Sequence, residues 1–252
     1  MADDLSQDRH PASSDAMRDF WDKRARENAL WYICSNLDYA QPDSERFWAS
    51  GEEDLDRILP QFEIHLDGSQ QVVEIGCGTG RLTRALARRT RMVVGIDVSA
   101  EMVERARKAL AAVPNAEVVL GNGRDLSDFK DASFDFGFSF IVFQHIPDPA
   151  ITATYIAEIG RVLRQGGSTV FQISQRTEYH ERAFWQTRHG LWDRFKWLVH
   201  VGPRGCLSAP WLGSSLTTAE LEAALSKGGL RLEKLVDAGT QFCLVHASKP
   251  AA

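Results

Sequence analysis

From Gln71 onward, short apolar runs alternate with segments whose apolar residues recur at helical spacing. The runs are rich in Val, Ile and Phe and predict five strands, at Val72–Ile75, Met92–Ile96, Ala116–Leu120, Phe134–Phe140 and Ser168–Ile173. The segments between them predict helices at Arg81–Arg89, Ser99–Ala111 and Thr152–Leu163. Strands separated by helices are typical of βαβ units, in which a parallel sheet is buried on both faces.

The chain after this region predicts an antiparallel end to the sheet. Strands are expected at Leu230–Asp237 and Gln241–Ser248, joined by a short turn, and Thr217 with Glu220 caps a helix that precedes them. The predicted fold class is therefore α/β, with a doubly wound, mostly parallel seven-stranded sheet, a terminal antiparallel hairpin and helical lid elements.

The segments outside the alternating region predict the lid elements. Asp15–Trp31 has the spacing of an amphipathic helix with an aromatic face, and the capping-box pair Ser50 and Glu53 predicts a second helix. We expect a flexible N-terminus at residues 1–14, a helical lid at 15–66 and one domain at 67–252. Residues 176–215 form an aromatic-rich lid insertion within that domain.

Composition changes this picture little. The 252 residues are 44% hydrophobic, and a net charge of −5 disfavours a nucleic-acid partner, which attracts Lys and Arg. The four cysteines show neither paired nor metal-ligand spacing. No stretch approaches the roughly 18 apolar residues of a membrane span, and the N-terminus is polar. These features predict a cytoplasmic protein without a membrane partner, and they leave open whether it is a monomer or homodimer.

The first predicted strand runs into a glycine-rich turn, Gly76-Cys77-Gly78-Thr79-Gly80, followed by a helix. Glycines at alternate positions allow a sharp turn and leave room for a ligand against the main chain. The spacing is not that of a dinucleotide fingerprint, because Arg81 stands where its third glycine belongs. Asp97 ends the second strand, where a carboxylate accepts hydrogen bonds from ribose hydroxyls. The two features predict a nucleoside across the carboxyl ends of both strands.

The stretch from Val72 to Ile146 resembles class I methyltransferases that use S-adenosylmethionine (SAM), and in particular their small-molecule, ubiquinone- and menaquinone-biosynthesis-like branch. The resemblance implies SAM as cofactor and S-adenosylhomocysteine (SAH) as product. It implies that Asp97 holds the ribose, that Val98 and Met102 flank the adenine, and that Ser139 and Phe140 lie beside the methionine portion. The loop around the methionine half would comprise Glu74, Gly76, Cys77, Gly78 and Gly80.

In the segment Gly121–Leu126 the resemblance places further cofactor contacts. Asn122 and Gly123 occupy the adenine-contacting pair, with Arg124 beside them and Asp125 as an alternative partner for the adenine amine. For the methionine carboxylate, guanidinium chemistry suggests Arg24 or Arg26, although an arginine in either position is more often a solvated helix residue.

Methyl transfer chiefly requires that the acceptor be held in line with the activated methyl, which can lower the barrier by about 7 to 11 kcal/mol. A histidine would add general-base catalysis for a hydroxyl acceptor. His145 follows the fourth strand and is the first candidate, with His180 and His189 in the insertion, and bracing of the loop is the alternative for His145. The ends of the fourth and fifth strands lack an acid pair, so no metal is expected.

Aromatic residues of the N-terminal lid and the insertion are predicted to roof the cleft, either as acceptor contacts or as packing. The predicted substrate-binding residues are Trp21, Trp31, Tyr32, Phe143, Phe184, Trp185 and Trp192. The expected activity is methylation of a small, apolar or aromatic molecule in secondary metabolism, with the accepting atom open. A non-catalytic SAM- or SAH-binding protein, a protein or RNA methyltransferase, and a nicotinamide-dependent oxidoreductase are the alternatives; the glycine spacing and the lack of a Tyr-x-x-x-Lys pair weaken the last.

Overall fold

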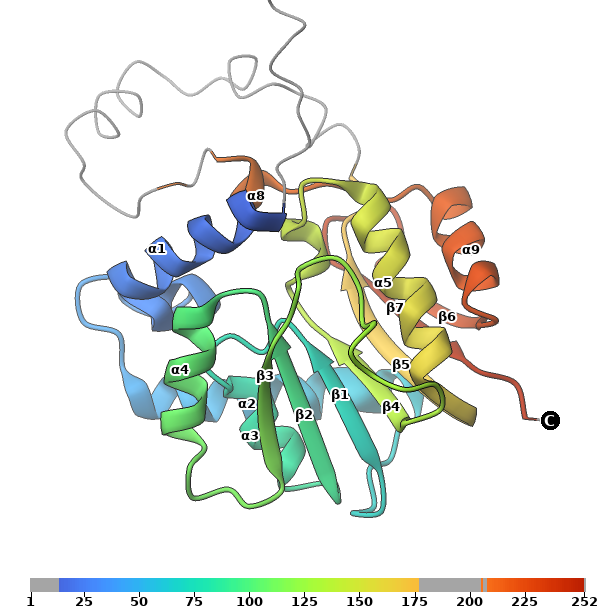
Figure 1. Cartoon of the computed structure of the whole chain (residues 1–252), viewed down its shortest axis with the longest axis horizontal. Coiled ribbons are helices and arrows are strands. Elements are labelled where there is room, and N and C mark those ends of the chain that lie inside the picture. The colour runs from blue at the N-terminus through green and yellow to red at the C-terminus, as the bar shows by residue number, and fades with distance from the viewer. Residues whose placement is uncertain (1–13, 177–204, 206–207, 252) are drawn as a thin grey trace, which may run out of the picture.

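The computed structural model describes residues 14–176, 205 and 208–251, and within them seven strands form a single sheet (Figure 1). The strand order is β3-β2-β1-β4-β5-β7-β6. The strands are β1 (Gln71–Ile75), β2 (Met92–Asp97), β3 (Ala116–Leu120), β4 (Phe134–Ser139), β5 (Leu163–Ile173), β6 (Arg231–Val236) and β7 (Cys243–Ser248).

The pairing confirms the predicted doubly wound sheet. β1 pairs in parallel with both β2 and β4, so the chain reverses its direction of winding at β1. β7 pairs antiparallel with β5 and with β6, which makes the predicted terminal hairpin. The helix before the hairpin, α9 (Thr218–Lys227), begins with the predicted capping box of Thr217 and Glu220.

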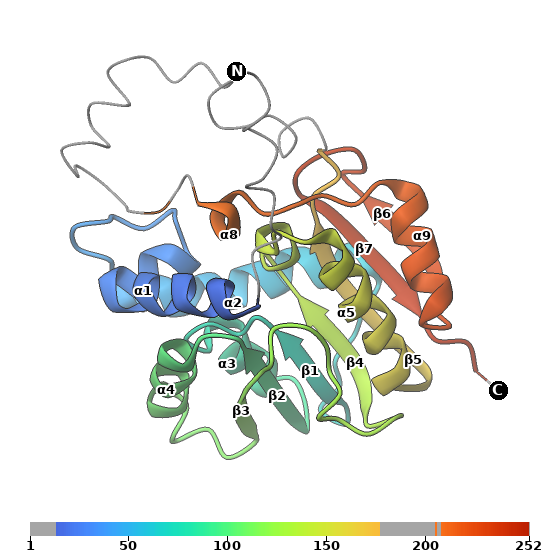
Figure 2. The ribbon, with the colours of Figure 1, turned by 45° about the horizontal axis from the view of Figure 1, so that its top comes forward.

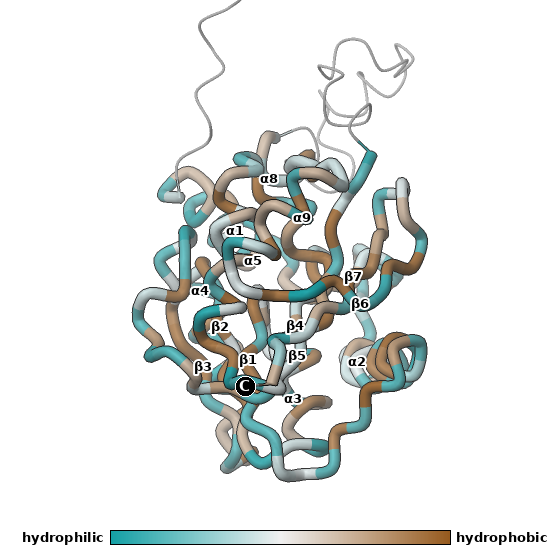
Figure 3. Tube along the Cα trace, turned by 90° about the vertical axis from the view of Figure 1, so that its right-hand side faces the viewer, coloured by the Kyte–Doolittle hydropathy of each residue, from teal (hydrophilic) through white to brown (hydrophobic). Residues whose placement is uncertain are grey.

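Helices bury both faces of this sheet, which explains the nearly continuous apolar strands. The helices after the first strands are α3 (Arg81–Ala87), α4 (Ala100–Ala109) and α5 (Pro149–Val162). Val72 of β1 packs in one core with α3 and with the earlier helix α2 (Ser44–Ile58), whereas its neighbour Val73 packs in the opposite core with α5 and α9. In Figure 3 the hydrophobic stretches of the trace gather in the strands, and hydrophilic stretches form outer loops.

Two helices precede the sheet, α1 (Ser14–Ile33) and α2 (Ser44–Ile58), followed by a short 3-10 turn, η1 (Leu59–Phe62). The helical path of α1 is broken at Asn28, whose φ and ψ are −164° and 78°. The prediction that α2 starts at Ser50 is wrong. Asp43 caps this helix by accepting from the amides of Glu45 and Arg46, while Ser50 lies inside it and donates to a carbonyl of the preceding turn.

The predicted boundaries around the fifth strand are also corrected. α5 begins three residues earlier than expected, because Asp148 caps it and Pro149 occupies the first helical position. β5 begins at Leu163 rather than at Ser168, and an irregularity in its register lies between these two residues. Of the insertion, the structure describes residues 176 and 205 and the end, residues 208–215, which carries α8 (Ala209–Leu212).

α1 and α8 lie beyond the carboxyl ends of the parallel strands (Figure 2). Another short 3-10 turn, η2 (Phe143–His145), follows β4 at the same edge. No helix among the described residues combines the length and apolar character needed to cross a membrane.

Candidate functional site

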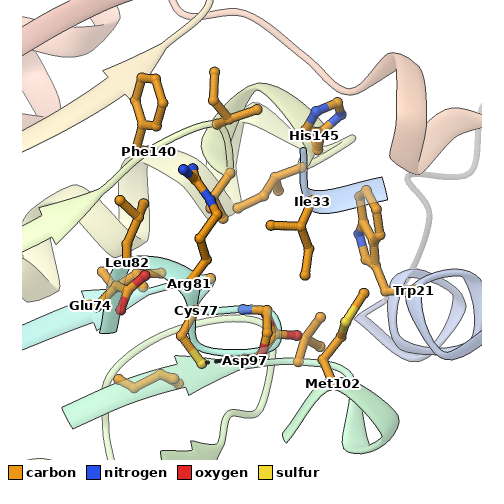
Figure 4. A pocket seen from close by; sticks show the side chains of 18 of the residues that line it. Trp21, Ile33, Glu74, Cys77, Arg81, Leu82, Asp97, Met102, Phe140 and His145 are labelled. Atoms are coloured by element: carbon orange, nitrogen blue, oxygen red, sulfur yellow. Dashed lines mark hydrogen bonds between the residues drawn. The ribbon is translucent and has the colours of Figure 1, made fainter. Parts of the chain in front are cut away.

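A cavity lies at the carboxyl ends of β1, β2 and β4, beneath α1, and holds about 980 Å³ of empty space including its open mouth. This is where an open α/β sheet binds ligands, because the strand order reverses there. Glycine-loop and acidic residues lie along one side, and mostly apolar residues of α1 and of the loop after β4 lie along the other (Figure 4). The wall includes Met17, Trp21, Tyr32, Ile33, Glu74, Gly76, Cys77, Gly78, Arg81, Asp97, Val98, Met102, Phe140, Ile141, Val142, His145 and Tyr155.

The glycine turn is shaped by its main chain. Gly76, Gly78 and Gly80 all have positive φ, a conformation that other residues adopt at a cost. The amide of Gly76 donates to the carbonyl of Ile96 at 2.7 Å, which ties the turn to β2. A Cβ on Gly76 would lie 2.2 Å from a methyl of Val142. The turn therefore has glycine for two separate reasons, and its bare backbone forms part of the cavity wall.

Asp97 lies at the end of β2 and faces this turn. Its carboxylate accepts from the amide of Gly78 at 2.8 Å and from the amide of Ser99 at 2.9 Å. Burial raises the pKa of Asp97 to about 6, against the lowering effect of these two hydrogen bonds. The carboxylate is held in a fixed orientation at the cavity wall, with acceptor capacity left for a hydroxyl pair.

Glu74 is the second acid of the cavity and is almost fully buried. The hydroxyl of Thr83 donates to its Oε2 at 2.6 Å. Burial raises the pKa of Glu74 to about 7, while Thr83 and the nearby Arg81 oppose the rise. A cationic group in the cavity would favour the ionised form of this carboxyl.

The predicted adenine-contacting segment lies next to the cavity rather than in its wall. Asn122 donates to Asp125 at 2.6 Å and accepts from the amides of Arg124 and Asp125, so these side chains satisfy one another. A Cβ on Gly123 would meet Val98 and Met17, which do line the cavity. The segment therefore packs behind the wall at Val98 and Met17.

At the end of β4, Phe140 lines the cavity as predicted, whereas Ser139 is buried and donates to the carbonyl of Ile75 at 3.0 Å. Ile141 lines the cavity with a φ of 57°, which is unusual for a β-branched residue. Strained backbone of this kind concentrates at functional sites. Sequence reasoning missed Ile141 and Val142, because no local pattern marks a positive φ at isoleucine.

Both ring nitrogens of His145 have partners. Its Nδ1 lies 2.8 Å from the carbonyl oxygen of Trp211, which only accepts, so Nδ1 carries the proton. Its Nε2 lies 3.1 Å from the side-chain amide nitrogen (Nε2) of Gln144, which donates to it. The side-chain amide nitrogen of Gln172 in turn donates to the side-chain oxygen (Oε1) of Gln144 at 3.1 Å. The ring is thus held in one tautomer at the cavity wall.

The aromatic roof is only partly a cavity wall. Trp21 and Tyr32 line the cavity, and burial raises the pKa of the Tyr32 hydroxyl well above its ordinary value. Trp31 does not line it and stacks on Trp211, with centroids 6.1 Å apart. Phe143 is buried in the core and stacks on Tyr155, so the structure places it in packing below the cavity.

The two arginines predicted for the methionine carboxylate point elsewhere. Arg24 pairs with Glu27 at 3.1 Å and lies over the rings of Phe20 and Tyr32. Arg26 is mostly exposed and pairs with Glu101. Arg81, which sequence reasoning named only as a departure from the dinucleotide pattern, lines the cavity instead.

Several predicted residues lie outside the part that the structure describes: His180, His189, Phe184, Trp185 and Trp192. Within the described ranges, no three His, Cys, Asp or Glu side chains are grouped as metal ligands.

Comparison with known proteins gives a family match over the same region. Residues 72–167 match the model of the methyltransferase domain family. The chain is 33% identical over 132 residues to trans-aconitate 2-methyltransferase of Azoarcus sp., covering 51% of this chain and 49% of that protein. It is 30% identical over 142 residues to ubiquinone biosynthesis O-methyltransferase of Idiomarina loihiensis, covering 53% and 57%. The chain spans about half the length of these two curated relatives.

Solved structures share the fold at low identity. A SAM-dependent methyltransferase from Methanosarcina mazei is 21% identical, with a TM-score of 0.52, and covers 77% of this chain and 98% of its own. The [4+2]-cyclase SpnF is 16% identical, with a TM-score of 0.55 and 82% of each chain covered. These similarities concern the fold, and the reaction has to be argued from the site.

Proposed function

We propose that this chain, whose residues 72–167 match the methyltransferase domain family, is a class I enzyme that transfers a methyl group from SAM to a small, largely apolar or aromatic molecule. The observation that carries the proposal is one cavity that combines a bare glycine turn, a carboxylate at the end of β2 and an aromatic roof.

The residues of the cavity fit SAM in three respects. Gly76 and Gly78 line the cavity without side chains, so an extended ligand can lie against the main chain there. Asp97 would accept from the ribose hydroxyls, and Val98 and Met102, which line the same cavity, would contact the adenine ring. Glu74 offers a buried carboxylate to the cationic amino acid end.

SAM supplies a methyl group that its sulfonium already activates, and the protein's contribution is mainly positioning. The apolar part of the wall, formed by residues such as Ile33, Val142 and Tyr155, would hold an apolar acceptor and exclude water. We assign His145 to bracing rather than to proton abstraction, because an acceptor would have to displace Gln144 to reach its Nε2 lone pair.

Purified protein incubated with SAM and a panel of phenols and apolar carboxylic acids should yield a product heavier by one CH₂ unit, detected by mass spectrometry. Binding of SAM and SAH should be measured first by calorimetry. If neither SAM nor SAH binds, the proposal is wrong. If SAM binds but no acceptor yields a methylated product, the non-catalytic alternative is favoured.

As a second candidate function, the protein would use the same cavity to bind its ligand without transferring a methyl group. The similarity of the fold to that of a [4+2]-cyclase supports this second candidate, because a protein with this architecture carries the name of a different reaction. An isotope-labelling experiment distinguishes the two candidate functions, because the label of methyl-labelled SAM appears in the product only if the protein is a methyltransferase. Methylation of protein or RNA is disfavoured by the net charge and by the roof over the cavity. A cytoplasmic location, a monomer or homodimer, metal independence and a role in secondary metabolism remain predictions.

A further inference from the structure

Trp21 of α1 presents an unpaired hydrogen-bond donor to the cavity. The residue lines the cavity and is half-buried, and its indole nitrogen has no hydrogen bond to any described residue. Figure 4 shows the edge of the ring that carries this nitrogen turned toward the cavity, on the side of Ile33. A tryptophan N–H usually has a partner when it is buried, so a free one in a cavity wall indicates a ligand.

A ligand atom can reach this nitrogen. Among the described residues, the side-chain atoms that are both unpaired and fully buried include Nε of Arg24 and the hydroxyl of Thr79, but not Nε1 of Trp21. The indole N–H therefore combines two properties that a ligand-binding donor requires, a free valence for a hydrogen bond and accessible surface.

Three aromatic contacts hold the ring of Trp21 in place. Phe20 meets it edge-on with centroids 5.1 Å apart, His145 does so at 5.6 Å, and Trp211 lies at 6.4 Å. His145 is itself held in one tautomer between the carbonyl of Trp211 and the side chain of Gln144. The bracing by His145 thus extends to Trp21, and the direction of the N–H is set before a ligand binds.

The other polar side chains on this side of the cavity are engaged or lie toward the cofactor. The hydroxyl of Tyr32 donates within α1 at 3.0 Å, and both ring nitrogens of His145 are bonded. Burial, and then the charges of nearby acids that include Asp97, raise the pKa of Tyr155, so its hydroxyl lies on the ribose side. Trp21 therefore offers the donor that remains for the methyl acceptor.

The charged side chains of the cavity come from other elements. In the described wall they are Glu74, Asp97 and Arg81, at the ends of β1 and β2 and at the start of α3. α1 and the loop after β4 contribute no charged side chain to the described wall, since His145 is held neutral. A carboxylate buried beside Trp21 would lack a cation, which is costly. A neutral carbonyl oxygen needs only a donor, and an indole N–H only donates.

We propose that Trp21 determines acceptor specificity, and that its indole N–H donates to a neutral carbonyl oxygen of the methyl acceptor, such as that of an aryl ketone or ester. The inference rests on the proposed function, because it narrows the class of acceptor bound at the same site. Phenols that also carry a ketone or ester group are therefore the acceptors to add to the methylation panel.

The first test compares probes that differ in one atom. Acetophenone and 2-acetylnaphthalene are titrated into the full chain saturated with SAH, each beside the alkene in which CH₂ replaces the carbonyl oxygen. Trp21→Phe removes the same ring area from both members of a pair, so the ratio of their affinities reports the N–H alone. This ratio should shift toward the alkene by about 2- to 10-fold in Trp21→Phe, as expected for one neutral hydrogen bond.

Trp48→Phe is the matched control, because Trp48 is also half-buried but lies on α2 and does not line the cavity. It should keep the wild-type ratio. Binding of SAH by Trp21→Phe reports that this variant is folded.

The second test observes the N–H directly. The chain has seven tryptophans, and loss of one indole signal in the nitrogen–proton NMR spectrum of Trp21→Phe identifies that of Trp21. Acetophenone should move the Trp21 indole proton downfield, whereas its alkene partner should not, because only the ketone accepts a hydrogen bond. A merely structural role of the ring would give the same response to both probes.

The inference is overturned if the Trp21 signal stays in place when the ketones bind, or if Trp21→Phe keeps the wild-type ratio. Tighter binding of benzoate than of acetophenone, or no binding of either ketone to the protein saturated with SAH, also overturns it. All these results leave the proposed function intact. The proposed function fails on a different result, in which the wild type binds neither SAM nor SAH.

Discussion

Glu74 and Asp97 are carboxyl groups whose burial raises their pKa, to about 7 and about 6 respectively. Between its ordinary pKa and its raised folded pKa, such a carboxyl is mostly protonated in the folded protein and mostly ionised in the unfolded chain. Each therefore contributes stability that is complete below its ordinary pKa and is lost as the pH rises through its folded pKa. A cofactor that presents a positive charge to Glu74 and hydroxyl donors to Asp97 offsets this loss, so the two acids are destabilising without ligand and useful with it.

Replacement of Glu74 by glutamine tests this directly. Glu74→Gln should raise the free energy of unfolding of the unliganded protein by up to about 3 kcal/mol at pH 8 and change it little at pH 4, where the carboxyl is protonated in both states. Urea unfolding at the two pH values measures the difference. SAM binding at pH 8 should weaken in the same variant.

Glu117→Gln serves as the control for the glutamate substitution, because Glu117 is exposed on β3. It should leave stability unchanged at both pH values. An equal effect of Glu74→Gln at pH 4 and pH 8 would show that the charge of this carboxyl is not the cause.

At the scale of elements, the end of α1 packs onto the glycine turn. A Cβ on Gly78 would lie 2.7 Å from Cδ1 of Ile33, closer than such atoms approach in proteins. Gly78 also has a φ of 54°, where a residue with a side chain costs about 1–2 kcal/mol. The helix is thus fitted against a turn without side chains, and the cavity between them depends on that fit.

A double-mutant cycle separates the two costs. Gly78→Ala should destabilise the protein through both strain and contact, and Ile33→Ala should remove the contact, so the double variant should cost less than the sum by about 1 kcal/mol. Gly68→Ala is the control: Gly68 has a φ of 88° and open space around it, so it meets strain alone. Chemical denaturation measures each variant. Additive effects of Gly78→Ala and Ile33→Ala would place the end of α1 away from the turn.

The elements that the sequence predicted well are those with local causes. Alternation of apolar runs and helical segments predicted the sheet, and the glycine turn with Asp97 predicted where the cavity lies. The start of α2 was wrong, because both Ser50 and Asp43 suit a cap and only the folded chain selects between them. The position of Arg81 in the cavity was missed for a similar reason, since its orientation depends on Asp54 from a separate helix.

For the whole molecule, Trp211 of α8 joins three elements above the cavity. Its ring stacks on Trp31 and contacts Tyr32, both on α1, and its carbonyl accepts from His145 of η2. Gly213, just after α8, packs closely against η2, because a Cβ there would lie 1.6 Å from the main-chain carbonyl oxygen of Gln144. The described end of the insertion thus holds the N-terminal helix over the carboxyl edge of the sheet.

Removing the ring should therefore loosen α1 without unfolding the sheet. Aromatic pairs contribute about 0.5–1.5 kcal/mol each beyond their buried area, and Trp211→Ala removes several of them at once. We expect faster hydrogen exchange at the amides of α1, unchanged exchange in β1 and β4, and several-fold weaker SAH binding. Phe242→Ala, at a ring that is 52% exposed, should change none of these. If α1 keeps its protection in Trp211→Ala, then α8 does not hold the roof, and the roof depends on contacts such as that of Ile33 with the glycine turn instead.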